Sequence, residues 1–122
     1  MAKNESDVRT RVLLVEDVDW IRAMMRASLE ARGYVVTEAR DEREAVTAAE
    51  RARPGLVLTE EELPTFGALM RSSRSHPALS RVPVAVINPD AEDGALYDGA
   101  HVLPDYEQLE RLLAPHAPVN GD

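Results

Sequence analysis

The chain has 122 residues, which is enough for one domain with a single hydrophobic core. Its 22 acidic residues outweigh 14 basic ones, and the resulting net charge of -8 argues against direct binding of DNA or RNA. Cysteine is absent, which excludes disulfides, thiol catalysis and thiolate metal sites. Because neither a signal peptide nor a membrane-spanning run is found in the sequence, we expect a cytoplasmic protein without membrane partners.

Short apolar runs indicate where the strands of the domain lie. A run without polar interruption, such as Val12 to Val15, is typical of a strand buried on both faces of a parallel sheet. The five strands that we predict span residues 11–15, 34–39, 56–59, 82–87 and 101–103.

Apolar residues at helical spacing predict four helices between and after these strands. Their predicted ranges are 19–32, 41–53, 66–75 and 106–114. Asp19 is the expected N-cap of the first helix, and Met24 and Met25 are expected in its buried stripe. Trp20 is interpreted as a half-buried packing residue, with the anchoring of a partner as the alternative.

Strands that alternate with helices predict an α/β fold whose parallel sheet is covered on both faces. The segment from Asn88 to His101 is short and contains Pro89 and Gly94, so the helix expected there is shortened or lost. The expected domain limits are residues 1–10 for a flexible leader, 11–114 for the folded domain and 115–122 for a C-terminal tail.

Acidic residues follow two of the predicted strands. Glu16 and Asp17 follow the first strand, and Glu60, Glu61 and Glu62 follow the third. Because right-handed crossovers bring the carboxyl ends of parallel strands to one edge, we expect these carboxylates to gather there. Two interpretations stay open: the cluster binds Mg²⁺ weakly, or it is a solvated acidic edge without an ion.

Three segments together resemble the receiver domain of two-component response regulators. They are V-L-L-V-E-D at 12–17, L-E-A-R-G-Y-V-V-T-E-A at 29–39 and R-P-G-L-V-L-T-E-E-E-L-P at 53–64. Each segment is a weak signal, but their order and spacing are specific, and the resemblance covers residues 11–114. It implies a flavodoxin-like, doubly wound (βα)5 fold with a five-stranded parallel sheet.

The resemblance also implies a chemistry. In the family, an aspartate after the third strand accepts a phosphoryl group while an acidic pair holds Mg²⁺. A Thr or Ser after the fourth strand and a Lys before a Pro after the fifth then bind that group, and partners read the resulting shift. Carried over to this chain, the implied metal positions are Glu16, Asp17, Glu60 and Glu62.

The chain departs from the family at the positions that carry the phosphoryl switch. Glu60 stands where the phosphoacceptor aspartate belongs, and Asn88 stands where the Thr or Ser belongs. Leu103, before Pro104, stands where the Lys belongs. His101 stands at a position that is often aromatic in the family and reports the switch state.

We therefore expect an atypical, stand-alone receiver (a pseudo-receiver) that is not an enzyme and acts in signal transduction by protein–protein contact, independently of phosphorylation. The expected partner is a histidine kinase, another regulator or an output protein. The surface expected to bind it comprises Asn88, Tyr97, His101, Pro104 and Tyr106. Three alternatives stay open: a receiver locked in an active-like state by Glu60, an Mg²⁺-dependent phosphoacceptor at Glu60, and a binder of a small ligand at the same edge.

Overall fold

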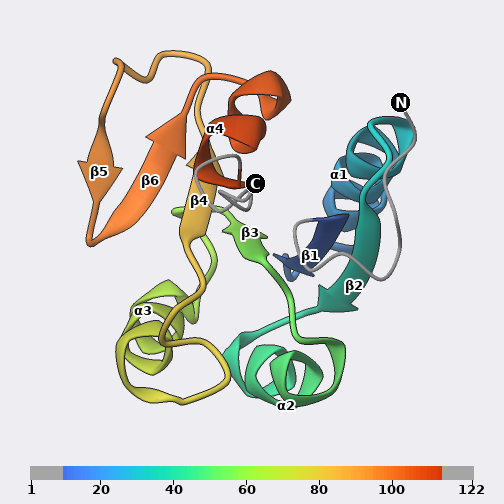
Figure 1. Ribbon diagram of the computed structural model, residues 1–122, viewed down its shortest axis with the longest axis vertical. Helices are drawn as coiled ribbons and strands as arrows, with labels where there is room; N and C mark the ends of the chain where they lie inside the picture. Colours follow the sequence, from blue (N-terminus) through green and yellow to red (C-terminus); the bar gives the residue numbers. More distant parts are fainter. Residues whose placement is uncertain (1–9, 114–122) are drawn as a thin grey trace, which may run out of the picture.

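Six strands form one sheet in the order β2–β1–β3–β4–β6–β5 (Figure 1). The computed structural model describes residues 10–113. The strands are β1 (Arg11–Val15), β2 (Val35–Ala39), β3 (Leu56–Thr59), β4 (Val84–Ile87), β5 (Leu96–Tyr97) and β6 (Ala100–Leu103). The helices are α1 (Asp19–Ala31), α2 (Glu42–Ala52), α3 (Phe66–Ser75) and α4 (Leu109–Leu113), with the 3-10 turn η2 (Tyr106–Gln108) before α4.

Five of the strands are parallel, as the sequence predicts. The register places Val12 beside Val36 on one side and beside Leu56 on the other, so β1 lies between β2 and β3. β4 continues the sheet from β3, and β6 pairs with β4. The carboxyl ends of these five strands therefore lie along one edge of the sheet, which is the arrangement that the predicted site requires.

Helices cover both faces of the sheet, and the strand residues divide between them by alternation. Leu13, Val15 and Val57 face a core cluster that α2 and α3 close. Leu14 and Leu58 face a second cluster that α1 and α4 close. Figure 1 shows the two helix pairs on opposite sides of the sheet. The doubly wound α/β prediction is therefore confirmed.

The first helix differs from expectation at its start and on its outer face. Val18, not Asp19, is the N-cap of α1, and it makes no side-chain capping bond, so the prediction for Asp19 is wrong. Met25 is buried, but Met24 is 61% exposed and Trp20 is 66% exposed, so the predictions of a buried Met24 and a half-buried Trp20 are wrong. Consecutive helical residues point about 100° apart, so only one of two adjacent methionines can face the sheet.

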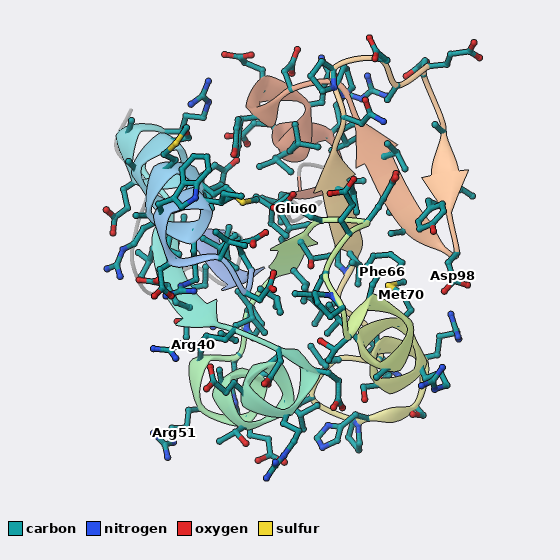
Figure 2. The ribbon with its side chains drawn as sticks, turned by 180° about the vertical axis from the view of Figure 1, so that it is seen from behind. Arg40, Arg51, Glu60, Phe66, Met70 and Asp98 are labelled. Carbon is teal, nitrogen blue, oxygen red and sulfur yellow. The ribbon has the colours of Figure 1, made fainter. Side chains whose placement is uncertain are left out.

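The segment before β6 forms a hairpin, which corrects the prediction of a sheet with five strands. No helix lies between β4 and β6, as predicted, and β5 pairs there with β6 in antiparallel orientation. The two strands are joined by Asp98 and Gly99, both at positive φ (50° and 89°), as a two-residue hairpin turn requires. The ring of Tyr97 then packs on Phe66 of α3, with ring centroids 5.4 Å apart. Figure 2 shows Phe66 beside this hairpin.

The described residues, 10–113, fall almost entirely within the expected domain of residues 11–114, whose limits stay a prediction. Thr10, expected in the leader, is buried at 4% exposure, so the folded part begins one residue earlier. The remaining leader, residues 1–9, and the tail lie outside the described residues, as does residue 114 of the last predicted helix. None of the helices between residues 10 and 113 has the length and apolar character needed to span a membrane.

Candidate functional site

The carboxyl ends of β1 and β3 bring Glu16 and Glu60 together. β1 and β3 are neighbours in the sheet, and each acid directly follows its strand. The Thr59 hydroxyl donates a hydrogen bond of 2.9 Å to the Val15 carbonyl, which ties the two strand ends to each other. Figure 2 shows Glu60 where β3 ends, in the middle of the domain. The two acids therefore lie close together, as the sequence predicts.

Glu16 is almost completely buried, at 2% exposure. Its Oε2 accepts a hydrogen bond of 2.8 Å from the Val18 amide, at the start of α1. Burial, followed by a side-chain hydrogen bond to Glu60, raises the pKa of Glu16 to about 8. A carboxyl group with a pKa of about 8 is mostly protonated at neutral pH, so Glu16 holds a proton there.

The predicted metal ligands are only partly gathered. Among residues 10–113, no three Asp, Glu or His side chains are grouped closely enough to hold a metal ion. Asp17 and Glu62 are exposed, and the Glu16 carboxyl is already bound by an amide and by Glu60. Oxygen donors are still the ligands that Mg²⁺ prefers. The set of Glu16, Asp17, Glu60 and Glu62 therefore stays a prediction.

Asn88 and Leu103, which stand where the resemblance places the phosphoryl-binding residues, lie next to each other. Each of them has a structural role here. The Asn88 amide donates to the Leu103 carbonyl at 2.8 Å, which joins the ends of β4 and β6. The Asn88 side-chain Oδ1 accepts from the Asp90 amide at 2.9 Å and so closes its own loop. Leu103 is 6% exposed and packs in the core with Leu109 and Leu113.

The predicted partner surface is divided between the two faces of the sheet. Opposite residues of an antiparallel pair share a face, so His101 lies with Leu96 and Tyr97 lies with Ala100 on the other face. His101 lines a shallow groove with Pro83 and other residues near the start of β4, at the end of the sheet away from Glu60.

The other three residues of the predicted partner surface lie nearer the carboxyl edge. Asn88, Pro104 and Tyr106 follow β4 or β6 and are half-buried. Since the two faces are separated by the sheet itself, the five predicted residues do not form one continuous patch.

Thr59 was not predicted as a site residue, and Tyr106 was predicted only as part of the partner surface. Thr59 ends an otherwise apolar strand, and a buried polar residue at a strand end is a signal that could have revealed it. Tyr106 lies under the Arg32 guanidinium, which is 5.2 Å from the centre of its ring. Burial raises the pKa of Tyr106, and the charge of Glu60 adds to this shift, so the ring lies within electrostatic reach of the site. Only the fold could reveal that proximity.

Comparisons with known proteins agree with this geometry. No protein-family model matches the sequence. The gliding motility regulatory protein of Myxococcus xanthus is 37% identical over 82 residues, which is 66% of this chain but only 11% of that protein.

Solved receiver domains share the fold over most of their length. The receiver domain of a signal transduction histidine kinase from Syntrophus aciditrophicus has a TM-score of 0.72 and 24% identity, over 93% of this chain and 96% of that chain. The receiver domain of sensor histidine kinase PA1611 from Pseudomonas aeruginosa, solved with magnesium in its active site cleft, has a TM-score of 0.70 and 27% identity, over 86% of this chain and 98% of that chain. The folded part of the chain thus has the fold of response regulator receiver domains, the class that serves two-component signal transduction.

Proposed function

We propose that this receiver domain signals by binding a protein partner and does so without being phosphorylated. One observation carries the proposal: each position that the phosphoryl switch needs is occupied by a residue with another role. Glu60 pairs with Glu16, Asn88 closes its own loop, and Leu103 fills the core. A phosphoryl group added here would meet neither the hydroxyl nor the ammonium group that normally binds it.

The pairing of Glu60 also argues against permanent mimicry of the phosphorylated state. A mimic has to direct its charge toward the switch positions at the ends of β4 and β6. The Glu60 carboxyl is hydrogen-bonded instead to Glu16, which belongs to the opposite neighbour of β3. The proton that Glu16 holds further lowers the negative charge at this edge, whereas a phosphoryl group brings up to two charges.

A receiver that uses Glu60 as its phosphoacceptor is the second candidate. It is favoured by the magnesium ion in the similar receiver of PA1611 and by the acid at the end of β3. If Mg²⁺ binds here, Asp17 and Glu60 would hold it, and the ion would neutralise charge on an incoming phosphoryl group. The buried Leu103 opposes this candidate, because it supplies no positive charge to the product.

The hairpin is the part of the predicted partner surface best suited to binding a protein. Leu96 is 64% exposed and Tyr97 is 46% exposed, both on the edge strand β5. Exposed apolar and aromatic side chains that project from a defined backbone are typical of protein interfaces. The similarity to receivers of histidine kinases supports a kinase, another regulator or an output protein as the partner.

The test is affinity purification of the tagged chain from the cells that make it, with bound proteins quantified by mass spectrometry. A Leu96→Asp, Tyr97→Ala variant should lose the specific partner, while Glu60→Ala should keep it. Arg51→Lys, an exposed change on α2, is the control for handling and expression. Loss of the partner with Glu60→Ala, together with its retention by the hairpin variant, would contradict the proposal.

A further inference from the structure

The outer face of α1 is apolar, although it is turned to solvent. Trp20 is 66% exposed and Met24 is 61% exposed. Ala23, Ala27 and Ala31 are also exposed and continue the same stripe toward the end of the helix. At 100° per residue, this stripe lies opposite the buried side of the helix. Surface helices normally carry polar residues on this face, so the stripe is unusual.

The charged residues of α1 lie beside the stripe and are occupied with one another. Arg22 donates to Asp19 at 2.8 Å and to Glu38 of β2 at 2.7 Å. Arg26 pairs with Glu30 at 2.8 Å and also with Glu38. These contacts hold the long cationic side chains toward β2. The apolar stripe is therefore left uncovered, where such side chains would otherwise lie across it.

Along the centre of the stripe, which excludes Ala23 at its side, side-chain size falls from the start of the helix to its end. The large residues Trp20 and Met24 occupy its first half, and the small residues Ala27 and Ala31 occupy its second half. A second copy packed in antiparallel orientation places Trp20 opposite Ala31 and Met24 opposite Ala27 of the other helix. Large side chains then fill the space that the alanines leave, which is how well-packed helix pairs interdigitate. A parallel pair would set large against large and small against small.

Charge at the two ends of the helix favours the same orientation. Asp17 and Asp19 lie at its start, and Arg32 follows its last turn. Antiparallel packing brings the acidic start of one helix near the basic end of the other and opposes the two helix dipoles. A parallel pair would place the four aspartates together.

We propose that the outer face of α1 is an interface between two copies of this chain, packed antiparallel about a two-fold axis near the middle of the helix. A helix of this length is only about 20 Å long, so the area buried by the pair stays below about 1,200 Å², as in weak complexes. We therefore expect a dissociation constant of the dimer on the order of 10–100 µM. β5 lies at the far edge of the sheet from β1 and β2, so both hairpins stay accessible in the dimer (Figure 1).

The test combines sedimentation velocity with tryptophan fluorescence over about 1–500 µM of the chain, a span that brackets such an affinity. Trp20 is the only tryptophan in the sequence, so its emission reports this face alone. The expected result is a rise from monomer to dimer, accompanied by a blue shift as Trp20 becomes buried. A chain that stays monomeric with unshifted emission at every concentration would overturn the proposal.

Variants on the stripe separate this interface from any other. Ala27→Glu changes an exposed residue, so the fold should be kept while the dissociation constant rises at least about tenfold. Thr47→Glu, which adds the same charge at an exposed position of α2, is the matched control and should leave association unchanged. The double variant Trp20→Ala, Ala31→Trp still places a large side chain opposite a small one, so it should form the dimer. The single variant Ala31→Trp places two large side chains opposite each other and should not.

Two further outcomes would also count against the proposal. A dimer that persists in Ala27→Glu would form through a different surface. A monomeric chain whose stripe variants lose a bound protein in affinity purification would assign the face to a helix of that protein instead of a second copy.

Discussion

The half of the domain around β1, β2 and β3 and the half around β4, β5 and β6 differ in how they follow the family pattern. In the first half, helix and strand alternate regularly, and the buried Glu16 meets the half-buried Glu60 where β1 and β3 end. In the second half, the helix between β4 and β6 is replaced by a hairpin, and Asn88 and Leu103 stand where the phosphoryl-binding residues belong.

The difference shows that the fold and the phosphoryl chemistry depend on separate sets of residues. The fold depends on alternating strand residues that fill two core clusters, and both clusters extend into both halves. The chemistry depends on a few side chains at one edge of the sheet, which can change without opening the core. The side chains at this edge can therefore differ from the family pattern while the receiver fold is kept.

The largest expected effect contrasts a core strand with the edge hairpin. Leu58 of β3 is completely buried, whereas Leu96 of β5 is 64% exposed. Leu58→Ala should lower the free energy of unfolding by about 3 kcal/mol, because it leaves a cavity between the sheet and its helices. Leu96→Ala should change it by less than about 0.5 kcal/mol. Urea unfolding of both variants measures the difference, and equal losses would mean that the hairpin is as much a part of the core as β3.

The next effect concerns pH and the acid pair. The pKa of Glu16 is about 8 in the folded chain against its ordinary 4.5, so the folded state binds the proton more tightly than the unfolded state. This contribution to stability is complete below about pH 4.5 and is lost as the pH rises through about 8. The unfolding free energy should therefore fall by up to a few kcal/mol between pH 5 and pH 8, as measured by urea unfolding in chelator.

Glu16→Gln is the matching variant, because an amide keeps the shape of the carboxyl group and can donate to Glu60 without titrating. It should flatten most of that pH dependence and make the chain more stable at pH 8. An unchanged slope in this variant would show that the dependence comes from other groups.

The smallest expected effect tests the hairpin itself. Tyr97→Ala removes the ring that packs on Phe66 and should cost about 1 kcal/mol of stability. Thermal unfolding followed by circular dichroism measures it, and Tyr97→Phe, which keeps the ring, should show almost no loss. A loss with Tyr97→Phe equal to that with Tyr97→Ala would mean that the hydroxyl, not the ring, holds the hairpin.

Most of the fold could be predicted from the sequence, because apolar runs such as Val12 to Val15 are long enough to mark buried strands. The hairpin was missed although its signal is present: Asp98 and Gly99 form a turn dipeptide between two short β-prone runs. Two-residue strands such as β5 carry too little periodicity to stand out on their own.

The site could be predicted only in part, since sequence order indicates which residues reach the carboxyl edge but not how they pair. The meeting of Glu16 and Glu60 follows from the order of the strands. That Glu16 is buried and bound to the Val18 amide depends on where α1 begins, and the expected N-cap was one residue late. The nearness of Tyr106 to Glu60 depends on how the turn after β6 packs, which leaves no mark in local sequence.

The most direct test of the account is intact mass spectrometry after incubation with Mg²⁺ and acetyl phosphate, with the native chain run beside a Glu60→Asp variant. The account predicts no phosphoryl adduct on the native chain. An adduct on the variant alone would mean that only the nucleophile at position 60 prevents phosphorylation. Absence of an adduct from both proteins would mean that other residues at the carboxyl edge also prevent it. A stable phosphoryl adduct on the native chain would contradict a receiver that works without phosphorylation.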